Sequence, residues 1–181
     1  MGSVSMTKAD EVMTPAYWAA ACAHLSKKDR VMKRLIPQFG DACLVSRGDA
    51  FVTLARSIVG QQISVKAAQS VWNKFAALSK KITPAGVLKL KVDDMRAAGL
   101  SARKVEYLVD LALHFHGKTV HVKEWQSMDD EAIIAELVAI RGIGRWTAEM
   151  FLIFHLMRPN VLPLDDVGLI NGISQSYFSG E

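Results

Sequence analysis

One stretch of sequence decides the fold, residues 137–150, which reads Leu-Val-Ala-Ile-Arg-Gly-Ile-Gly-Arg-Trp-Thr-Ala-Glu-Met. An apolar helix is expected to end near Ile140 and a second helix to begin near Gly144, with Gly142 between them. The two glycines carry no side chain that would hold a partner's backbone away. Amides at the start of the second helix point outward with the positive end of its dipole. We therefore expect a hairpin that can bind a phosphate; an ordinary turn packed in the core is the alternative.

Helix signals continue on both sides of this hairpin. A capping residue is followed by proline at Thr14-Pro15 and at Thr83-Pro84, which is typical of a helix start. Further helix starts are predicted at the capping residues Asp49, Ser64 and Ser101 and at the pair Ser127 and Asp130. Clean alternation of apolar and polar residues is nearly absent, which disfavours strands. The sequence therefore predicts an all-α chain of about nine helices.

Charge is spread unevenly along the 181 residues. Half of the chain is apolar and 22% is charged, which excludes a disordered tail. The net charge is +4, yet residues 1–120 carry 18 basic and 9 acidic side chains (+9), and residues 121–181 carry 4 and 9 (−5). A polyanion should therefore meet mainly the first two-thirds of the chain. The basic segment Lys27–Arg34 is either a solvated helix face or a phosphate contact.

Little in the sequence indicates a disulfide, a side-chain metal site or a membrane segment. The two cysteines, Cys22 and Cys43, are too few for a disulfide scaffold and are expected to be free thiols. His114 and His116 are two residues apart and would not face each other on a helix, so no zinc site is expected. The most apolar run, residues 150–157, is far shorter than the ~20 residues of a membrane helix, and no signal peptide is visible. These features predict a soluble cytoplasmic protein.

Four motifs resemble those of one enzyme family. Residues 137–150 resemble the helix–hairpin–helix motif of the DNA glycosylase superfamily, which includes endonuclease III and the 3-methyladenine DNA glycosylases. Residues 59–64 resemble the loop that the alkylation-repair members insert into duplex DNA. Residues 98–104 resemble their glycine-plus-basic turn before a long helix, and residues 162–168 resemble the segment with their catalytic aspartate. The four motifs occur in the family's order, and the chain is most similar to the DNA-3-methyladenine glycosylase II type.

The resemblance implies a catalytic carboxylate near residue 166. Asp166 falls where the family has its catalytic aspartate, and Asp165 is the competing carboxylate. The two carboxylates can also be read as a helix N-cap and a partner for the helix dipole. That reading is compatible with catalysis, because one aspartate can cap the helix while the other faces the substrate.

Trp146 occupies the second diagnostic position. Family members that also cut the DNA strand carry a lysine there, which forms a Schiff base with the sugar; tryptophan cannot do this. The resemblance therefore implies a monofunctional enzyme that hydrolyses the base from its sugar and leaves an abasic site. The indole also suits a positively charged purine in a base pocket, through cation–π attraction of about 0.5–2 kcal/mol. A tryptophan packed in the core is the alternative.

The resemblance also implies a set of DNA contacts. Gln62 would be the residue inserted into the duplex, although Gln61 and Gln62 can equally be read as a solvated loop. Arg141 and Arg145 would add positive charge beside the hairpin. The full set of implied DNA-binding residues is Gln61, Gln62, Ser64, Arg103, Lys104, Arg141, Gly142, Gly144, Arg145 and Thr147.

No organic cofactor is expected, and the only metal that the resemblance adds is a monovalent cation. Family hairpins sometimes hold such an ion through main-chain carbonyls. In this chain the carbonyls would be those of Val138, Ile140 and Ile143.

The resemblance implies a helical DNA glycosylase fold with a cleft between two helical subdomains. Residues 1–48 would supply the N-terminal helices of the second subdomain, and residues 49–158 would form the central domain with the hairpin. Residues 159–181 would carry the catalytic aspartate back to the second subdomain. This last segment looks truncated beside the family, whose members continue with further helices.

The expected function is base-excision repair by a monomeric, nucleoid-associated bacterial enzyme. It would flip an alkylated purine of the 3-methyladenine or 7-methylguanine type out of double-stranded DNA and hydrolyse its N-glycosidic bond. One alternative is a glycosylase for another lesion, such as uracil or a deaminated purine. The other alternative is a non-catalytic helix–hairpin–helix module that binds duplex DNA.

Overall fold

The computed structural model describes residues 14–46 and 48–180, and every regular element in these ranges is a helix, as predicted. No helix in these ranges is long and apolar enough to cross a membrane. The helices are α1 (Trp18–Lys28), α2 (Arg30–Leu35), the 3₁₀ helix η1 (Ile36–Phe39), α3 (Ala50–Gly60), α4 (Val65–Ala76), α5 (Pro84–Val87), α6 (Val92–Ala97), α7 (Ala102–His116), α8 (Asp130–Val138), α9 (Arg145–Phe154) and α10 (Val167–Tyr177).

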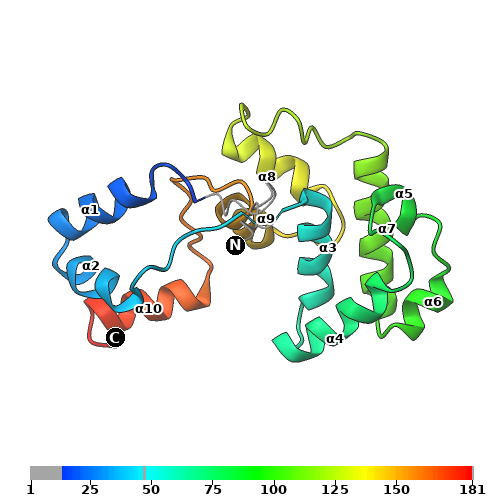
Figure 1. The fold of residues 1–181 in the computed structure, drawn as a ribbon, viewed down its shortest axis with the longest axis horizontal. Coiled ribbons are helices and arrows are strands. Elements are labelled where there is room, and N and C mark those ends of the chain that lie inside the picture. The colour runs from blue at the N-terminus through cyan, green and yellow to red at the C-terminus, as the bar shows by residue number, and fades with distance from the viewer. Residues whose placement is uncertain (1–13, 47, 181) are drawn as a thin grey trace, which may run out of the picture.

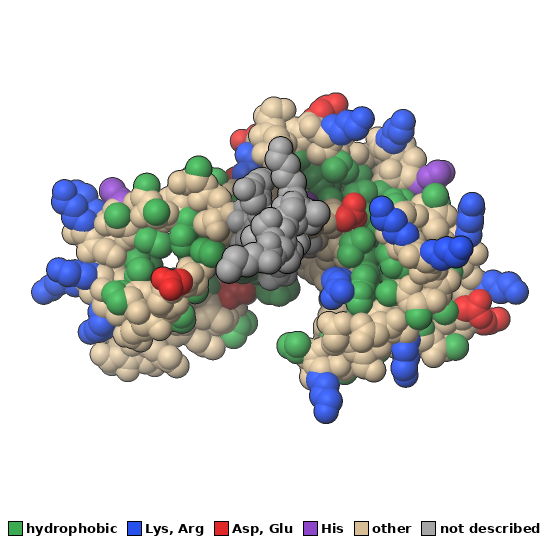
Figure 2. Space-filling view, in the orientation of Figure 1, with side chains coloured by type: hydrophobic (Ala, Val, Ile, Leu, Met, Phe, Trp, Pro, Cys, Tyr) green, Lys and Arg blue, Asp and Glu red, His purple; other side chains and the backbone are tan. Residues whose placement is uncertain are grey.

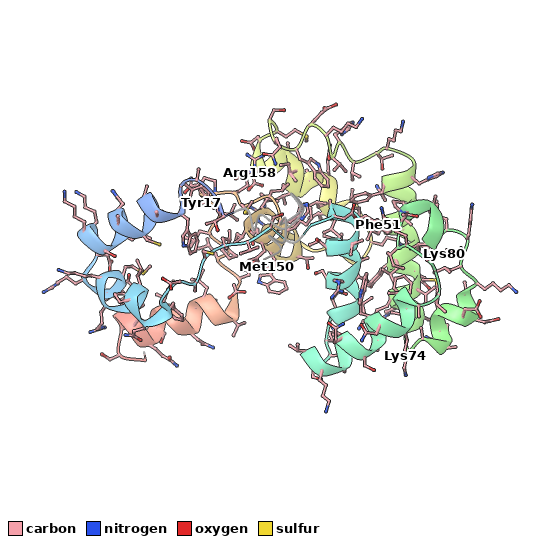
Figure 3. All side chains as sticks on the ribbon, in the orientation of Figure 1. Tyr17, Phe51, Lys74, Lys80, Met150 and Arg158 are labelled. Atoms are coloured by element: carbon pink, nitrogen blue, oxygen red, sulfur yellow. The ribbon has the colours of Figure 1, made fainter. Side chains whose placement is uncertain are left out.

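The helices form two lobes (Figure 1). Helices α3 to α9 make the larger lobe, while α1 and α2 lie beside α10, the last helix, in the smaller lobe. A hydrogen bond between Asp29 and Tyr177 joins the start of α2 to the end of α10. Near the junction of the lobes, the Tyr17 hydroxyl donates to the Met157 carbonyl at 3.0 Å (Figure 3). The subdomain boundaries at residues 48 and 158 stay a prediction, and residues 1–13 lie outside the described residues.

The buried hydrophobic core belongs to the larger lobe and spans residues 50–152. A chain of edge-to-face aromatic contacts runs through it, with ring centroids 5.4 to 6.1 Å apart, from Phe51 through Phe115 and Trp125 to Phe151. Such contacts add about 0.5–1.5 kcal/mol each beyond the buried area. In contrast, none of the described residues of α1, α2, η1 and α10 is fully buried. The larger lobe is therefore the rigid part of the molecule.

Local capping explains where most helices of the larger lobe begin. The side chains of Asp49, Ser64, Thr83 and Ser101 each accept a hydrogen bond from the amide three residues on, as the sequence predicted. Each such cap stabilises a helix by about 0.5–2 kcal/mol. The starts of these helices are thus fixed by contacts between residues that are close in sequence.

Two of the predicted caps are wrong. α1 begins at Trp18 and not next to Thr14, whose hydroxyl instead donates to the Cys43 sulfur at 3.3 Å. α8 is capped by Asp129, whose carboxylate accepts from the Glu131 amide at 2.9 Å. The Ser127 hydroxyl lies in the preceding turn, where it donates to the Glu124 carbonyl at 2.9 Å.

The helix count also differs from the prediction of about nine, because the described ranges hold ten α-helices and η1. The basic segment Lys27–Arg34 is not one helix. Asp29 ends α1 with extended backbone and caps α2 by accepting from the Met32 amide at 2.8 Å. Asp29 thus ends one helix and caps the next within a segment whose charge pattern suggested a single helix.

Glu136 on α8 anchors the long connection between α7 and α8. Its carboxylate accepts from the Trp125 indole N–H at 2.8 Å and from the His121 amide at 3.1 Å, and it also pairs with the His121 ring. Arg158 closes the same connection from the other side by donating to the Trp125 and Met128 carbonyls. The connection is therefore held by polar contacts, some exposed and some partly buried, as well as by the buried Trp125 ring.

Glu136 and His121 shift each other's pKa in opposite directions. The hydrogen bond and negative charge of Glu136 raise the pKa of His121 above its ordinary value. Burial alone would raise the pKa of Glu136, but hydrogen bonds from Trp125 and His121 outweigh it, so that this pKa lies below its ordinary value. Folding therefore favours the imidazolium–carboxylate pair.

This pair predicts a pH dependence of stability. The pKa of His121 is raised on folding. Its contribution to the free energy of unfolding is therefore complete below its ordinary pKa of 6.5 and is lost as the pH rises through its folded-state pKa. We expect the free energy of unfolding to fall more steeply above neutral pH in the parent protein than in His121→Gln, as measured by urea unfolding. His24→Gln, at an exposed position on α1, is the control and should keep the parent slope. Equal slopes in the parent and His121→Gln would contradict the prediction.

Candidate functional site

The glycine hairpin lies between α8, which ends at Val138, and α9, which begins at Arg145. Gly142 has a φ of +85°, and a Cβ added there would lie 2.2 Å from the ring of Tyr107 on α7. Gly144 is the N-cap of α9, with a φ of −89° and nothing within 4 Å of an added Cβ. Gly142 is therefore required for the close approach of the hairpin to α7, whereas Gly144 keeps the end of α9 open.

The N-terminus of α9 presents backbone amides at the end of the hairpin. The helical hydrogen bonds begin with Ala148, whose amide donates to the Gly144 carbonyl at 3.0 Å. The amides of residues 145–147 precede this bond and lie at the positive end of the helix dipole. Thr147 is only 8% exposed and lines a cavity between α3 and α9, and its predicted contact with DNA stays a prediction.

The two arginines beside the hairpin differ in their surroundings. Arg141 is exposed, and its backbone amide donates to the Asp110 carboxylate at 2.8 Å. Arg145 makes a two-pronged ion pair with Glu131, and its Nε donates to Glu149 at 3.0 Å. The charge of Arg145 is thus compensated inside the protein. The two ion pairs tie α8 to α9, and the predicted role of Arg145 as a phosphate contact stays a prediction.

Trp146 and Asp166, twenty residues apart in sequence, are in direct contact. The Trp146 indole N–H donates to Asp166 Oδ2 at 2.7 Å, while Asp166 Oδ1 accepts from the Leu169 amide at 2.6 Å. Asp166 is therefore the N-cap of α10 and the partner of Trp146 at the same time. The indole is 47% exposed, which rules out a tryptophan packed in the core.

These hydrogen bonds hold Asp166 ionised. The Leu169 amide and the Trp146 indole lower the pKa of Asp166 below its ordinary value, against a smaller opposing effect of burial. Asp165, the competing candidate, is exposed. The N-cap reading is confirmed for Asp166, and which of the two carboxylates faces the substrate stays a prediction.

The loop at residues 60–64 connects α3 to α4 beside the hairpin. The Gln61 side chain donates to the Gly142 carbonyl at 2.8 Å, so this residue is not part of a freely solvated loop. Gln62 is exposed and has a φ of +58°, in the left-handed region that non-glycine residues rarely adopt. Ser64 caps α4 by accepting from the Ala67 amide at 3.3 Å. Among these residues, Gln62 is the one that projects an uncommitted side chain at the turn.

The two basic residues at the start of α7 also have different surroundings. Arg103 is exposed. Lys104 is half-buried and its ammonium donates to the Val59 carbonyl at 2.7 Å, at the C-terminal end of α3. Burial lowers the pKa of Lys104. Lys104 therefore supports the end of α3, whereas Arg103 is the more exposed of the two basic side chains.

A cavity that sequence reasoning missed lies between α3 and α9. Its volume is about 240 Å³, and Thr53, Ser57, Thr147, Met150 and Phe154 are among the residues that line it. Met150, one turn after Trp146 on α9, lies in the central region between the lobes (Figure 3). The space-filling view shows the surface open between the two lobes on this side (Figure 2). The residues recur at helical spacing on two helices, but only the packing of α3 on α9 brings them together.

Two predictions concern metal ions: no site built from side chains, and a monovalent cation held by main-chain carbonyls. Among residues 14–46 and 48–180, no group of three or more potential side-chain ligands could hold a metal ion. His114 instead hydrogen-bonds to the Thr119 hydroxyl at 2.8 Å. The Ile140 carbonyl accepts from the Ile143 amide at 3.1 Å and keeps a second lone pair. A cation on the carbonyls of Val138, Ile140 and Ile143 fits this chemistry and stays a prediction.

Comparisons with known proteins agree on one family. The model described as HhH-GPD superfamily base excision DNA repair protein matches residues 55–181. DNA-3-methyladenine glycosylase 1 of Schizosaccharomyces pombe is 35% identical over 156 residues, which are 82% of this chain and 68% of that protein. Four other curated relatives are also longer than this chain, whose matches span 46% to 76% of their length.

Solved structures give the same picture. The crystal structure of the DNA-3-methyladenine glycosidase of Bacillus halodurans superimposes with a TM-score of 0.78 at 32% identity, covering 87% of this chain and 73% of that one. The 3-methyladenine DNA glycosylase of Schizosaccharomyces pombe in complex with abasic DNA gives a TM-score of 0.75 at 34% identity, covering 86% of this chain and 79% of that one.

The two glycines of the hairpin make a matched test of its packing. We expect Gly142→Ala to lower the free energy of unfolding by about 2–4 kcal/mol, because the added methyl group meets the Tyr107 ring and the backbone has a positive φ. Gly144→Ala, which meets open space, should cost at most about 1 kcal/mol. Urea unfolding of the two variants measures both values, and equal losses would contradict the assignment of Gly142 as the close-contact glycine.

The contact between Trp146 and Asp166 predicts a change in ionisation. Trp146→Phe keeps an aromatic ring but removes the N–H donor, so the pKa of Asp166 should rise toward its ordinary value of 3.8. An NMR titration of the Asp166 carboxyl carbon measures this shift. Trp18→Phe, on α1 in the smaller lobe, is the control. An unchanged pKa of Asp166 in Trp146→Phe would show that the indole does not stabilise the carboxylate.

Proposed function

The chain belongs to the HhH-GPD superfamily of base excision DNA repair proteins, and on this premise we propose that it hydrolyses the N-glycosidic bond of alkylated purines in duplex DNA. The observation that carries the proposal is the exposed Trp146 indole held on the ionised Asp166 carboxylate. The names of the relatives, which are DNA-3-methyladenine glycosylases and a glycosidase, support the choice of substrate class.

The reaction begins with exposure of the base. A base stacked inside a duplex cannot reach a carboxylate on the protein, so the nucleotide must flip out at a cost of a few kcal/mol. The opening between the lobes and the cavity between α3 and α9, which Met150 lines one turn after Trp146, would offer space for the base. Gln62, one of the exposed residues of the loop at residues 60–64, would fill the space left in the duplex.

The chemical step requires little acid catalysis. A purine alkylated on a ring nitrogen carries a positive charge and leaves readily, so the sugar develops positive charge in an oxocarbenium-like transition state. The Asp166 carboxylate, kept ionised by the Leu169 amide and the Trp146 indole, stabilises this charge and orients the attacking water. The exposed indole face attracts the cationic purine.

Trp146 also supports a monofunctional reaction. An indole nitrogen cannot attack the sugar to form a Schiff base, so the position offers no nucleophile for strand cleavage. The products are then a free base and an intact strand with an abasic site.

DNA is held without reading its sequence. The amides at the N-terminus of α9 suit a phosphate, and the exposed guanidinium groups of Arg141 and Arg103 add positive charge. Arg145, paired with Glu131 and Glu149, contributes through the position of α9. This arrangement supports two separate roles. Contacts with the DNA backbone place the protein on the duplex, and the pocket selects the base.

The two neighbouring aspartates provide a matched test. With duplex DNA treated with a methylating agent, we expect the parent protein to release 3-methyladenine or 7-methylguanine without strand scission. Asp166→Asn, which can still cap α10, should lower the single-turnover rate by about 100-fold or more and change the Kd for DNA by less than about threefold. Asp165→Asn should retain the parent rate within about threefold.

Each other outcome has a distinct meaning. Unchanged release by Asp166→Asn would exclude the proposed role of its carboxylate. Release of uracil or a deaminated purine, with none of the alkylated bases, would assign another lesion to the same site. DNA binding without release of any base would identify a non-catalytic module.

A further inference from the structure

Helix α7 supports both loops that face the candidate DNA surface. Lys104 donates to the Val59 carbonyl at 2.7 Å, just before the loop at residues 60–64. One turn on, Tyr107 packs against Gly142, and Asp110 accepts from the Arg141 amide at 2.8 Å. Residues three apart are neighbours on a helix surface, so one stripe of α7 holds the end of α3 and the hairpin. The two loops therefore share a rigid support.

Gln61 then joins the two loops directly. Its side-chain amide donates to the Gly142 carbonyl at 2.8 Å across 81 residues of sequence. The same carbonyl belongs to the residue whose close approach to Tyr107 tolerates no side chain. The glutamine thus bonds to the hairpin residue that is packed against Tyr107.

From these contacts we propose that Gln61 is a positioning residue. Its hydrogen bond to Gly142 fixes the loop that carries Gln62 against the glycine hairpin. Gln62 then enters the duplex at a fixed position relative to the phosphate that the hairpin binds. Gln61 and Lys104 each donate one hydrogen bond inside the protein, and the DNA contacts predicted for them from the sequence stay predictions.

The geometry of Gln62 explains why such a bond is needed. Gln62 follows Gln61 directly and holds a φ of +58°, which is unfavourable for a side chain that bears a Cβ. A strained backbone conformation persists only where contacts with neighbouring residues hold it in place. Gln61 on one side and the Ser64 cap of α4 on the other supply those contacts. Misplacement of a reacting group by about 1 Å can cost about 100-fold in rate, so a loosened loop should lower excision.

Adjacent glutamines allow the same chemical change at two positions. Gln61→Met keeps the length and volume of the side chain and removes the donor, whereas Gln62→Met makes the same change one residue on. We expect the amides of Arg141 and Ile143 to exchange with solvent about five- to tenfold faster in Gln61→Met and at the parent rate in Gln62→Met. Exchange at the core amide of Leu108 should not change in either variant. Gln69→Met, on the exposed face of α4, is the control for folding.

The second readout rests on the proposed function. In single-turnover assays on methylated duplex DNA, Gln61→Met should lower the rate of base release by about tenfold or more and leave the Kd for undamaged duplex within about threefold. Gln69→Met should match the parent protein in both.

The two readouts separate the possible failures. If the parent protein releases no base, the proposed function fails while the exchange data still test the contact between the loops. Hairpin exchange that is the same in Gln61→Met and the parent protein would overturn the coupling. Faster hairpin exchange with unchanged base release would overturn the positioning role, and faster exchange throughout the larger lobe would show a contribution to global stability instead.

Discussion

The hydrogen bond from the Trp146 indole to the Asp166 carboxylate joins the two lobes at the functional site. Trp146 lies in the first turn of α9 in the larger lobe, and Asp166 is the N-cap of α10, which lies with α1 and α2 in the smaller one (Figure 1). The smaller lobe has no fully buried side chain in its described helices, so its own packing constrains it weakly. The direct bond therefore defines where the carboxylate lies, and it also lowers the carboxylate's pKa.

The larger lobe supplies the rigidity that this bond requires. Its aromatic core fixes α9, and the ion pairs of Arg145 with Glu131 and Glu149 tie α9 to α8. Helix α7 holds the hairpin and the end of α3 through contacts that include the Gly142 backbone. The residues that face solvent at the site, Trp146 and Gln62, thus belong to elements whose neighbours are well packed. Charges near the site serve largely to position these elements, and fewer of them are available to a ligand than the sequence suggests.

Much of the fold could be predicted because its signals are local. Asp49, Ser64, Thr83 and Ser101 cap the helices that follow them, since a cap bonds an amide only a few residues away. The predictions failed at Thr14 and Ser127, where the candidate hydroxyl bonds elsewhere, and at Asp29, whose extended backbone breaks a basic helix. Thr14 bonds to Cys43, 29 residues away, so a tertiary contact decides there. Ser127 and Asp29, in contrast, bond to residues three positions away, so competing local contacts decide.

The sequence by itself determined the helical class, the glycine hairpin and the positions of Trp146 and Asp166, because these depend on residue type and near neighbours. Only the tertiary structure decided which groups meet. The bonds from Trp146 to Asp166 and from Gln61 to Gly142 span 20 and 81 residues, and the donors of Lys104 and Arg145 are used inside the protein. A basic or polar side chain looks equally available in the sequence whether it faces DNA or a carboxylate, since its partner is fixed by the distance between elements that only folding brings together.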